Sequence, residues 1–373
     1  MTLLEDIHAD HGAEFDSVGG RRVPRDYGRP ERTHRAVRNG VGLTEMPYGV
    51  VVVAGDDRIE YVNNVVSNEV PREDGQGQYA LLLDPQGRVE TDMYVYCAGD
   101  RLLLFVPPGE AASLAETWRE KVFIQDVDIS VATDDFGVFG VHGPKATEKV
   151  ASVLNSAGTP DEHLSFARGK IADVGVTVVR TDAPAGEEGY EVVCTTGETE
   201  DETGTSRSNV RLVFDTLLTR GLNAVPFGRR TWESLTLEAG TPLFEFELAD
   251  ELPNDLGLRN ALDFEKGCYV GQEVVSRIEN RGQPSQRLAG LLPESVPDRG
   301  AAVFAGDEAV GEVTRAVESP MRDEPVALAL VDFDVTPGAD VTVRVDGEER
   351  PAEVAALPFV EGSDRSGRVP RYE

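Results

Sequence analysis

Residues 266–273 read Lys-Gly-Cys-Tyr-Val-Gly-Gln-Glu and place one cysteine between glycines, directly ahead of a segment with helical spacing. A thiol reacts as the thiolate, which nearby positive charge and a helix N-terminus both favour. Cys268 is therefore a candidate catalytic nucleophile, and Lys266 is the group expected to favour its ionised form. Glu265 and Glu273 act in the opposite direction, so residue types alone leave the charge of the thiol open. The alternative is that Cys268 is a small buried residue in a tight turn.

The chain is strongly acidic. Its 373 residues include 67 acidic and 36 basic side chains, which gives a formal charge of −31. The acids are scattered apart from a short cluster at residues 198–202, so we interpret them as a halophilic adaptation to a salt-rich cytoplasm that screens their repulsion. A surface for a basic partner would instead concentrate the acids in one block. A charge of this sign argues against binding to nucleic-acid phosphates.

Cysteine and histidine usage argues against a metal site. Cys97, Cys194 and Cys268 are far apart and form no CxxC pair, so we expect neither a disulfide nor a self-contained zinc or iron–sulfur site. The five histidines show no metal-ligand spacing. There is no signal peptide and no apolar run long enough to cross a membrane. We therefore expect a cytoplasmic monomer that contacts neither membrane nor nucleic acid.

The pattern along the chain predicts an α+β protein that ends in a barrel. We expect helices over residues 3–12, 30–40, 56–64, 109–122, 144–155, 210–220 and 230–238, and one after residue 273. Strands are expected at residues 50–54, 78–83, 89–97, 102–106, 136–141 and 176–180, whereas residues 13–27 look irregular. Residues 195–209 are polar and acidic, which predicts an exposed loop or insertion. Beyond Gly282, short strands between glycine, proline and aspartate turns predict a small antiparallel barrel over residues 283–373.

The octet, with Asn280-Arg281-Gly282 after it, resembles the signature of the YgfZ family of folate-binding proteins that maintain iron–sulfur enzymes. That family is related to the glycine-cleavage T-protein, an aminomethyltransferase (GcvT). The likeness continues in T-protein order through residues 20–24, 75–79, 87–92, 142–144, 186–191 and 237–240. It implies a three-domain, GcvT-like cloverleaf around a channel for tetrahydrofolate. Two interleaved α+β domains are expected over residues 1–282, the second at roughly 50–132 and 164–242, followed by the C-terminal antiparallel β-barrel.

The resemblance also implies a folate site. A pterin offers N–H donors and a flat face, which suit carboxylates and a tyrosine ring. On the family pattern Tyr79, Asp92 and Glu191 are folate-binding candidates, and Asp92 matches the aspartate placed beside the reactive pterin nitrogen. Glu187 and Tyr190 are further candidates from the same segment as Glu191. Without the resemblance, each carboxylate would be assigned to the surface and each tyrosine to the core.

Some positions depart from the T-protein pattern. Trp232 falls where the T-protein has a functional arginine, and Arg230 or its neighbour Arg229 is the candidate replacement. Thr91 stands in place of the first of two aspartates, and the T-protein has no cysteine in the octet. These differences favour a folate binder that uses thiol chemistry in place of aminomethyl transfer.

Three functions follow from these observations. The first is a tetrahydrofolate-binding, YgfZ-like protein that supports iron–sulfur cluster assembly or repair, with Cys268 as nucleophile or ligand and iron–sulfur client proteins as partners. The second is a folate-dependent aminomethyl or methyl transferase, in which Asp92 orients the cofactor and Cys268 is structural. The sequence leaves open whether the chain is such an enzyme. The third is a non-enzymatic folate sensor or scaffold that binds a partner through residues 195–209.

Overall fold

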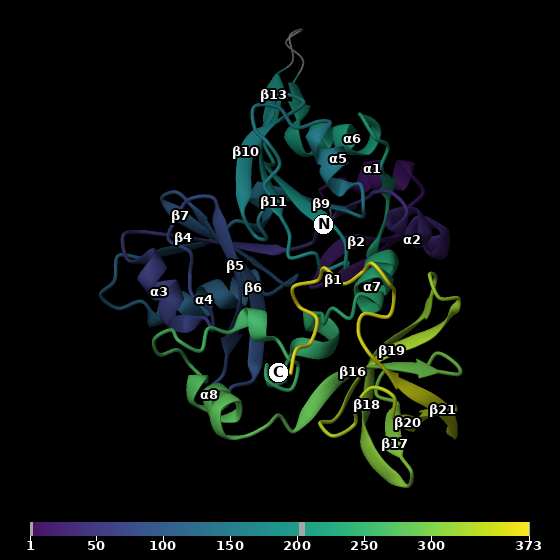
Figure 1. Ribbon diagram of the computed structural model, residues 1–373. Helices are drawn as coiled ribbons and strands as arrows, with labels where there is room; N and C mark the ends of the chain where they lie inside the picture. The colour runs from purple at the N-terminus through teal and green to yellow at the C-terminus, as the bar shows by residue number, and fades with distance from the viewer. Residues whose placement is uncertain (1–2, 201–205, 373) are drawn as a thin grey trace.

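The computed structural model of the chain describes residues 3–200 and 206–372. Three lobes meet around a common centre (Figure 1). Two lobes are sheets covered by helices, and the third is a closed six-stranded antiparallel barrel. The expected α+β class and the C-terminal barrel are confirmed.

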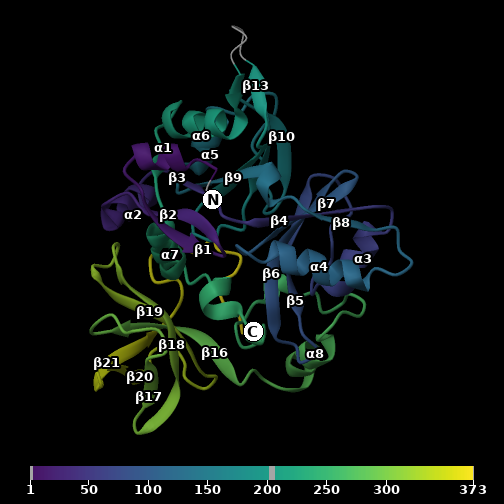
Figure 2. The same cartoon turned by 180° about the vertical axis from the view of Figure 1, so that it is seen from behind.

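The first lobe is a six-stranded sheet with the strand order β10-β11-β12-β9-β3-β15. Its strands are β3 (Gly42–Glu45), β9 (Phe136–His142), β10 (Phe166–Ile171), β11 (Val174–Arg180), β12 (Gly189–Thr195) and β15 (Val225–Pro226). One face packs against α1 (Glu5–Asp10), α5 (Ala146–Ala151) and α6 (Asn209–Thr219), around the buried rings of Phe139 and Phe214. Two further helices, α2 (Pro30–Arg38) and α7 (Arg229–Glu238), lie between this sheet and the barrel (Figure 2).

A short hairpin, β13 (Glu198–Glu200) and β14 (Ser206–Ser208), projects from this lobe (Figure 1). It occupies the segment where the sequence predicts an exposed insertion at residues 195–209. The part of that segment at residues 201–205 lies outside the described residues.

The expectation of an irregular stretch at residues 13–27 is wrong. Strands β1 (Glu14–Val18) and β2 (Arg21–Asp26) pair antiparallel around Gly19 and Gly20, whose φ angles are 53° and 75°. A two-glycine loop with positive φ is a strong hairpin signal. The hairpin is hard to recognise in the sequence, because about half of the flanking residues are charged and they do not alternate regularly with apolar ones.

The second lobe is a five-stranded sheet with the strand order β5-β6-β7-β4-β8. Its strands are β4 (Gly49–Ala54), β5 (Gln76–Leu83), β6 (Val89–Ala98), β7 (Arg101–Val106) and β8 (Asp128–Val131). Helices α3 (Arg58–Val65) and α4 (Ala111–Lys121) cover one face, and the other face turns to the centre of the molecule. A short 3₁₀ helix, η1 (Thr133–Asp135), follows β8. A π-helical turn, η2 (Phe244–Leu248), and a 3₁₀ helix, η3 (Arg259–Ala261), lie between α7 and the last helix.

Strand pairing divides residues 1–282 differently from the expected boundaries. Residues 49–131 form the five-stranded sheet alone, whereas four of the strands within residues 164–242, β10, β11, β12 and β15, join β3 and β9 in the six-stranded sheet. The two lobes are interleaved in the chain, with residues 49–131 inserted between β3 and β9. The expected partition differs because the hydrophobic period of a strand identifies the strand without identifying the strands beside it.

The barrel follows helix α8 (Gln272–Arg281), which lies at the outer edge of the five-stranded lobe (Figures 1 and 2). Its closed strand order is β16-β19-β18-β17-β20-β21. The strands are β16 (Gln286–Pro293), β17 (Ala302–Ala305), β18 (Glu308–Ser319), β19 (Glu324–Asp332), β20 (Asp340–Val345) and β21 (Glu348–Ala355). Residues 356–372, which we call the C-terminal strap, then leave the barrel and return to the centre (Figure 1).

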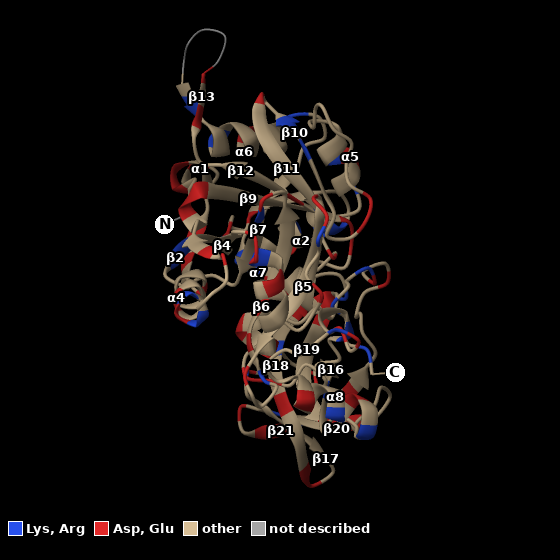
Figure 3. Ribbon diagram, turned by 90° about the vertical axis from the view of Figure 1, so that its left-hand side faces the viewer, with Lys and Arg blue, Asp and Glu red and all other residues tan. Residues whose placement is uncertain are grey.

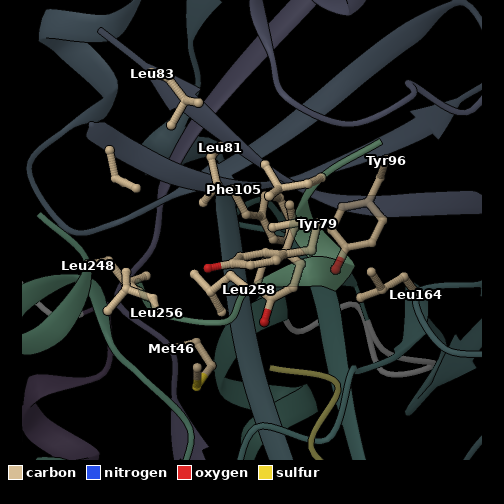
Figure 4. Packing of buried hydrophobic residues seen from close by; sticks show 14 of the residues in the cluster. Met46, Tyr79, Leu81, Leu83, Tyr96, Phe105, Leu164, Leu248, Leu256 and Leu258 are labelled. Carbon is tan, nitrogen blue, oxygen red and sulfur yellow. The ribbon is translucent and has the colours of Figure 1, made fainter. Parts of the chain in front are cut away.

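All three lobes contribute to one central hydrophobic cluster. Tyr79, Tyr96 and Phe105 from the five-stranded sheet pack there with Leu248 and Leu258 (Figure 4). Barrel side chains belong to the same cluster. Because burial of large apolar surfaces is the main favourable term in folding, this shared core holds the lobes in a fixed relation.

Acidic side chains are distributed over all three lobes and do not form a single block (Figure 3). Within the described ranges, no helix is both long and apolar enough to cross a membrane.

Candidate functional site

A cavity of about 150 Å³ opens between the two sheet lobes. Its walls are mostly apolar and include Met46, Tyr48, Phe105, Pro107, Trp232 and Phe244. Asp92 and Arg368 supply polar groups to the same cavity, and Arg229, Glu233 and Glu245 form a second polar group. A mostly apolar hollow with a few convergent charges is the usual form of a small-molecule site.

Three buried carboxylates beside this cavity each accept a hydrogen bond from a tyrosine. The hydroxyl of Tyr79 donates to Asp92 Oδ2 at 2.7 Å. Tyr94 and Tyr48 donate to Asp182 Oδ1 and Glu191 Oε1, both at 2.8 Å, and these three tyrosines come from β5, β6 and the link between β3 and β4. Burial raises the pKa of each tyrosine well above 10, so the three hydroxyls act as donors.

The buried guanidinium of Arg368 lies among these carboxylates. Its Nε atom is 3.1 Å from Asp182 Oδ2, and its Nη1 atom is 3.8 Å from Asp92 Oδ2. The guanidinium also sits over the rings of Tyr79 and Tyr94, 5.0 and 5.7 Å from their centroids. Arg368 is held there by the C-terminal strap, in which Gly367 N donates to Asp182 O at 2.8 Å.

Burial and unequal charge raise the affinity of this cluster for protons. Burial raises the pKa of Glu191 to about 7, the hydrogen bond from Tyr48 acts against it, and the charge of Asp182 adds to it. Burial also raises the pKa of Asp92, although Arg368 and Tyr79 oppose the effect. Glu191 Oε2 is buried without a hydrogen-bond partner among the described residues. The cluster can therefore accept hydrogen bonds, or a proton, from a ligand in the cavity.

Comparison with known proteins places this arrangement in a family. Residues 4–266 match the GCVT N-terminal domain, and residues 286–361 match the glycine cleavage T-protein C-terminal barrel domain. This chain belongs to the glycine-cleavage T-protein family. The match covers both sheet lobes and the barrel, so it includes every residue of the buried cluster except Arg368.

Relatives align with the whole T-protein fold. An aminomethyltransferase of Corynebacterium aurimucosum is 30% identical over 374 residues, which cover 96% of this chain and 98% of the relative. An aminomethyltransferase of Streptomyces coelicolor is also 30% identical and covers 96% of each chain. The crystal structure of glycine cleavage system aminomethyltransferase T from Bartonella henselae superimposes with a TM-score of 0.82 at 23% identity, over 97% of this chain and 98% of that one.

Of the residues expected to bind folate, Tyr79, Asp92 and Glu191 lie together in the buried cluster. Of these three, Asp92 lines the cavity, whereas Tyr79 and Glu191 do not. Tyr190 does not, because neighbouring residues of β12 point to opposite faces of the sheet. Its ring packs in the core behind the sheet, and its hydroxyl accepts a hydrogen bond from Arg180 at 2.6 Å.

Glu187 and Arg230 also lie outside the cavity lining. Glu187 accepts a hydrogen bond from Arg38 at 3.2 Å. Arg230 is half exposed and lies 3.6 Å from Asp26. Its neighbour Arg229, the other candidate from the sequence, lines the cavity and pairs with Glu245 at 2.8 Å.

Cys268 and Lys266 are separate from the cavity. Cys268 is exposed, in contrast to the buried Cys97 and Cys194, and is not among the residues that line the cavity. The expected activation of Cys268 by Lys266 is not seen, because the ammonium group is directed elsewhere. It donates to the backbone carbonyls of three residues near the end of α3, at 2.7 to 2.8 Å: Asn63, Val66 and Asn68.

Sequence analysis missed Asp182, Arg368 and Tyr48. Each stands in a loop or a terminal segment, and each is brought to the cluster by tertiary structure. The nearest signal was the segment at residues 186–191 that resembles the T-protein, which begins four residues after Asp182. Nothing in the local sequence around Arg368 distinguishes it from the other arginines of an acidic chain.

Among the residues that the structure describes, no group of three histidine, cysteine, aspartate or glutamate side chains could hold a metal ion.

Proposed function

We propose that the cavity binds tetrahydrofolate and that the chain is a folate-dependent one-carbon transferase of the aminomethyltransferase type. The observation that carries the proposal is the buried cluster of Asp92, Asp182 and Glu191 beside an apolar, aromatic-walled cavity. The relatives that match over nearly the whole chain are named aminomethyltransferase, which supports the second function considered from the sequence over the YgfZ-like one.

The residues present fit a reduced folate. A pterin has a flat ring and several N–H donors on one edge, so it needs an apolar slot and buried acceptors. Glu191 Oε2 is such an acceptor: it is buried without a partner among the described residues, and it belongs to the cluster of which Asp92 and Arg368 line the cavity. Trp232, Tyr48 and Phe244 supply flat or apolar walls. When bound, tetrahydrofolate supplies the nitrogen that accepts the one-carbon unit.

Asp92 is the residue best placed to handle a proton in this cavity. Its carboxylate lines the cavity and is fixed by the hydroxyl of Tyr79 at 2.7 Å. Because burial raises its pKa, Asp92 accepts a proton more readily than an exposed aspartate does. Arg368 limits this effect by keeping positive charge 3.8 Å away.

The test is a titration of the purified protein with tetrahydrofolate, beside Asp92→Ala and Glu191→Gln. We expect saturable binding by the wild type and binding weakened at least about ten-fold in each variant. Asp100→Ala, which removes an exposed carboxylate, serves as the control. Equal affinities in all four proteins would remove the cavity from the proposal. Turnover with methylene-tetrahydrofolate, ammonia and a lipoyl carrier then tests transfer itself.

A YgfZ-like role in iron–sulfur maintenance is the second candidate. It is favoured by one observation: an exposed Cys268 stands between two anchored residues, Lys266 and the buried Tyr269. An exposed thiol on a fixed loop suits exchange with a client protein. Cys268→Ser should then abolish support of iron–sulfur enzymes while leaving tetrahydrofolate binding intact. Normal iron–sulfur enzyme activity in cells that carry only the serine variant would exclude this role.

A further inference from the structure

His142 is a buried histidine next to the cavity that the proposed chemistry does not use. It lies at the end of β9 and is 0% exposed. On the same face of the sheet, two positions back along β9, Gly140 pairs with Glu191 of β12 and Thr44 of β3. His142 and Glu191 are therefore diagonal neighbours on adjacent strands. Such neighbours on one sheet face are about 7–8 Å apart.

Glycines make room for the imidazole ring. The residues paired with His142 are Gly189 and Gly42. A Cβ atom at Gly189 would come within 2.8 Å of His142 Nδ1, and one at Gly140 within 2.6 Å of Nε2. Any larger side chain at Gly189 or Gly140 would displace the ring. The space that the imidazole occupies therefore depends on these two glycines.

Neither ring nitrogen of His142 has a hydrogen-bond partner among the described residues, and both are buried. Burial lowers the pKa of His142 to about 3, so the ring is neutral and offers one donor and one acceptor. A buried polar group without a partner destabilises the folded state, because it has lost its hydrogen bonds to water. Such a cost in a native protein calls for a partner that arrives with a ligand or with water.

Trp232 lies between this histidine and the cavity. Its ring is 5.0 Å from that of His142, centroid to centroid, and the same side chain lines the cavity. The imidazole also contacts Phe227, whose ring centroid is 6.2 Å away and whose side chain is fully buried. Trp232 is only partly buried, whereas Phe227 is fully buried, so of these two neighbours Trp232 is the one in contact with the cavity.

We propose that His142 is a ligand-binding residue of this cavity, reached when Trp232 turns aside, and that it hydrogen-bonds an uncharged polar group of the ligand such as a lactam or an amide. A neutral imidazole matches such a group, whereas a carboxylate would find no positive charge there. Glu191, one row away, takes N–H donors of the same ligand. This inference rests on the proposed binding of tetrahydrofolate, which has both kinds of group.

The first test compares 5-formyltetrahydrofolate binding and thermal stability in the wild type and in His142→Phe. Phenylalanine fills the space of the ring and removes the two unpartnered nitrogens. We expect a higher melting temperature without ligand and affinity weakened about ten-fold. His142→Gln, which keeps a donor and an acceptor, should recover part of the affinity. His163→Phe, at an exposed histidine outside the cavity, is the control.

The second test observes the nitrogens directly, by nuclear magnetic resonance of protein labelled with ¹⁵N-histidine. Comparison with His142→Phe assigns the His142 signals, and 5-formyltetrahydrofolate should shift at least one of them while leaving those of His163 in place. Unchanged His142 signals together with equal affinity in His142→Phe would overturn the inference. If the wild type binds no folate at all, the proposed function fails instead, and Asp92→Ala then has no effect to compare.

Discussion

At the scale of single residues, the decisive feature is an imbalance of buried charge. Asp92, Asp182 and Glu191 are each less than about one-tenth exposed and share one buried cation, Arg368. Burying more than one uncompensated carboxylate is costly, so at least one of the three tends to take up a proton. Burial raises the pKa of Glu191 to about 7.

Replacing Glu191 with glutamine should stabilise the protein above neutral pH. Because the pKa of Glu191 rises from 4.5 to about 7, its ionisation in the folded state costs on the order of 3 kcal/mol at pH 8. Between pH 4.5 and about pH 7 the folded state holds more protons than the unfolded state, so the stability of the wild type falls as the pH rises. Glu191→Gln lacks this fall.

Chemical denaturation of both proteins at pH 4, 6 and 8 measures the difference, which should be absent at pH 4 and largest at pH 8. Glu265→Gln, at an exposed position, is the control. A difference that stays constant with pH would show that Glu191 does not titrate in this range.

At the scale of elements, the octet acts first as an anchor for α3. The last carbonyls of a helix have no partners within it, and here the ammonium of Lys266 supplies one for Asn63 and for Val66. The same ammonium binds Asn68 O, beyond the helix, and lies 5.5 Å from the ring centroid of Tyr269. The loop that carries Cys268 is thereby held against the five-stranded lobe.

Lys266→Met should therefore destabilise the protein, by about 2–3 kcal/mol, because three carbonyls lose a charged donor. Lys266→Arg should not restore the loss fully, since the planar guanidinium cannot reproduce a compact ammonium among three carbonyls. Hydrogen exchange at the end of α3 should rise in both variants. Lys121→Met, at the exposed end of α4, controls for the loss of a surface lysine. Wild-type exchange rates in Lys266→Met would contradict the anchoring role.

At the scale of the whole molecule, the C-terminal strap contacts the barrel and both sheet lobes and places Arg368 in the cavity wall. Ser366 Oγ is 2.7 Å from Thr241 Oγ1, and Arg371 N donates to Gly257 O at 2.9 Å. The hydroxyl of Tyr372 accepts from Leu288 N, at the start of the barrel, at 2.7 Å. Because one short segment contacts both the barrel and the carboxylates, the position of Arg368 depends on the position of the barrel.

Arg368→Leu tests that coupling. Removing the buried cation beside Asp92 and Asp182 leaves these two carboxylates without it and should cost about 3–5 kcal/mol of stability. Adding Asp182→Asn should recover part of the loss, because one of the unpaired charges is removed. A double-mutant cycle by chemical denaturation measures the coupling. Strictly additive effects would show that the two side chains do not interact.

Stability should also increase with salt. A formal charge of −31, spread over the lobes, repels itself in dilute buffer (Figure 3). Raising the ionic strength from about 0.15 M to 1 M shortens the screening length from about 8 to 3 Å and should raise the melting temperature. Scans in sodium chloride and potassium chloride should agree. A melting temperature that is flat or falls over this range would contradict the adaptation to a salt-rich cytoplasm.

Most elements could be predicted from local pattern, because the period of buried side chains is a property of a short segment. The strand expected at residues 89–97 appears as β6 (Val89–Ala98), and the helix expected at residues 230–238 as α7 (Arg229–Glu238). The partition of the sheets was not predictable in the same way. Residues 164–242 carry strands whose partners, β3 and β9, lie far away in the chain.

The sequence by itself determined the class of fold, the barrel and three side chains of the cluster, Tyr79, Asp92 and Glu191, because these stand in recognisable local segments. Only the tertiary structure decided that Lys266 binds carbonyls and that Arg368 enters the cavity. The physical reason is that a side chain's partners are set by which segments pack together. Arg368 is far from Asp92 and Asp182 in the sequence, and only folding brings them into contact.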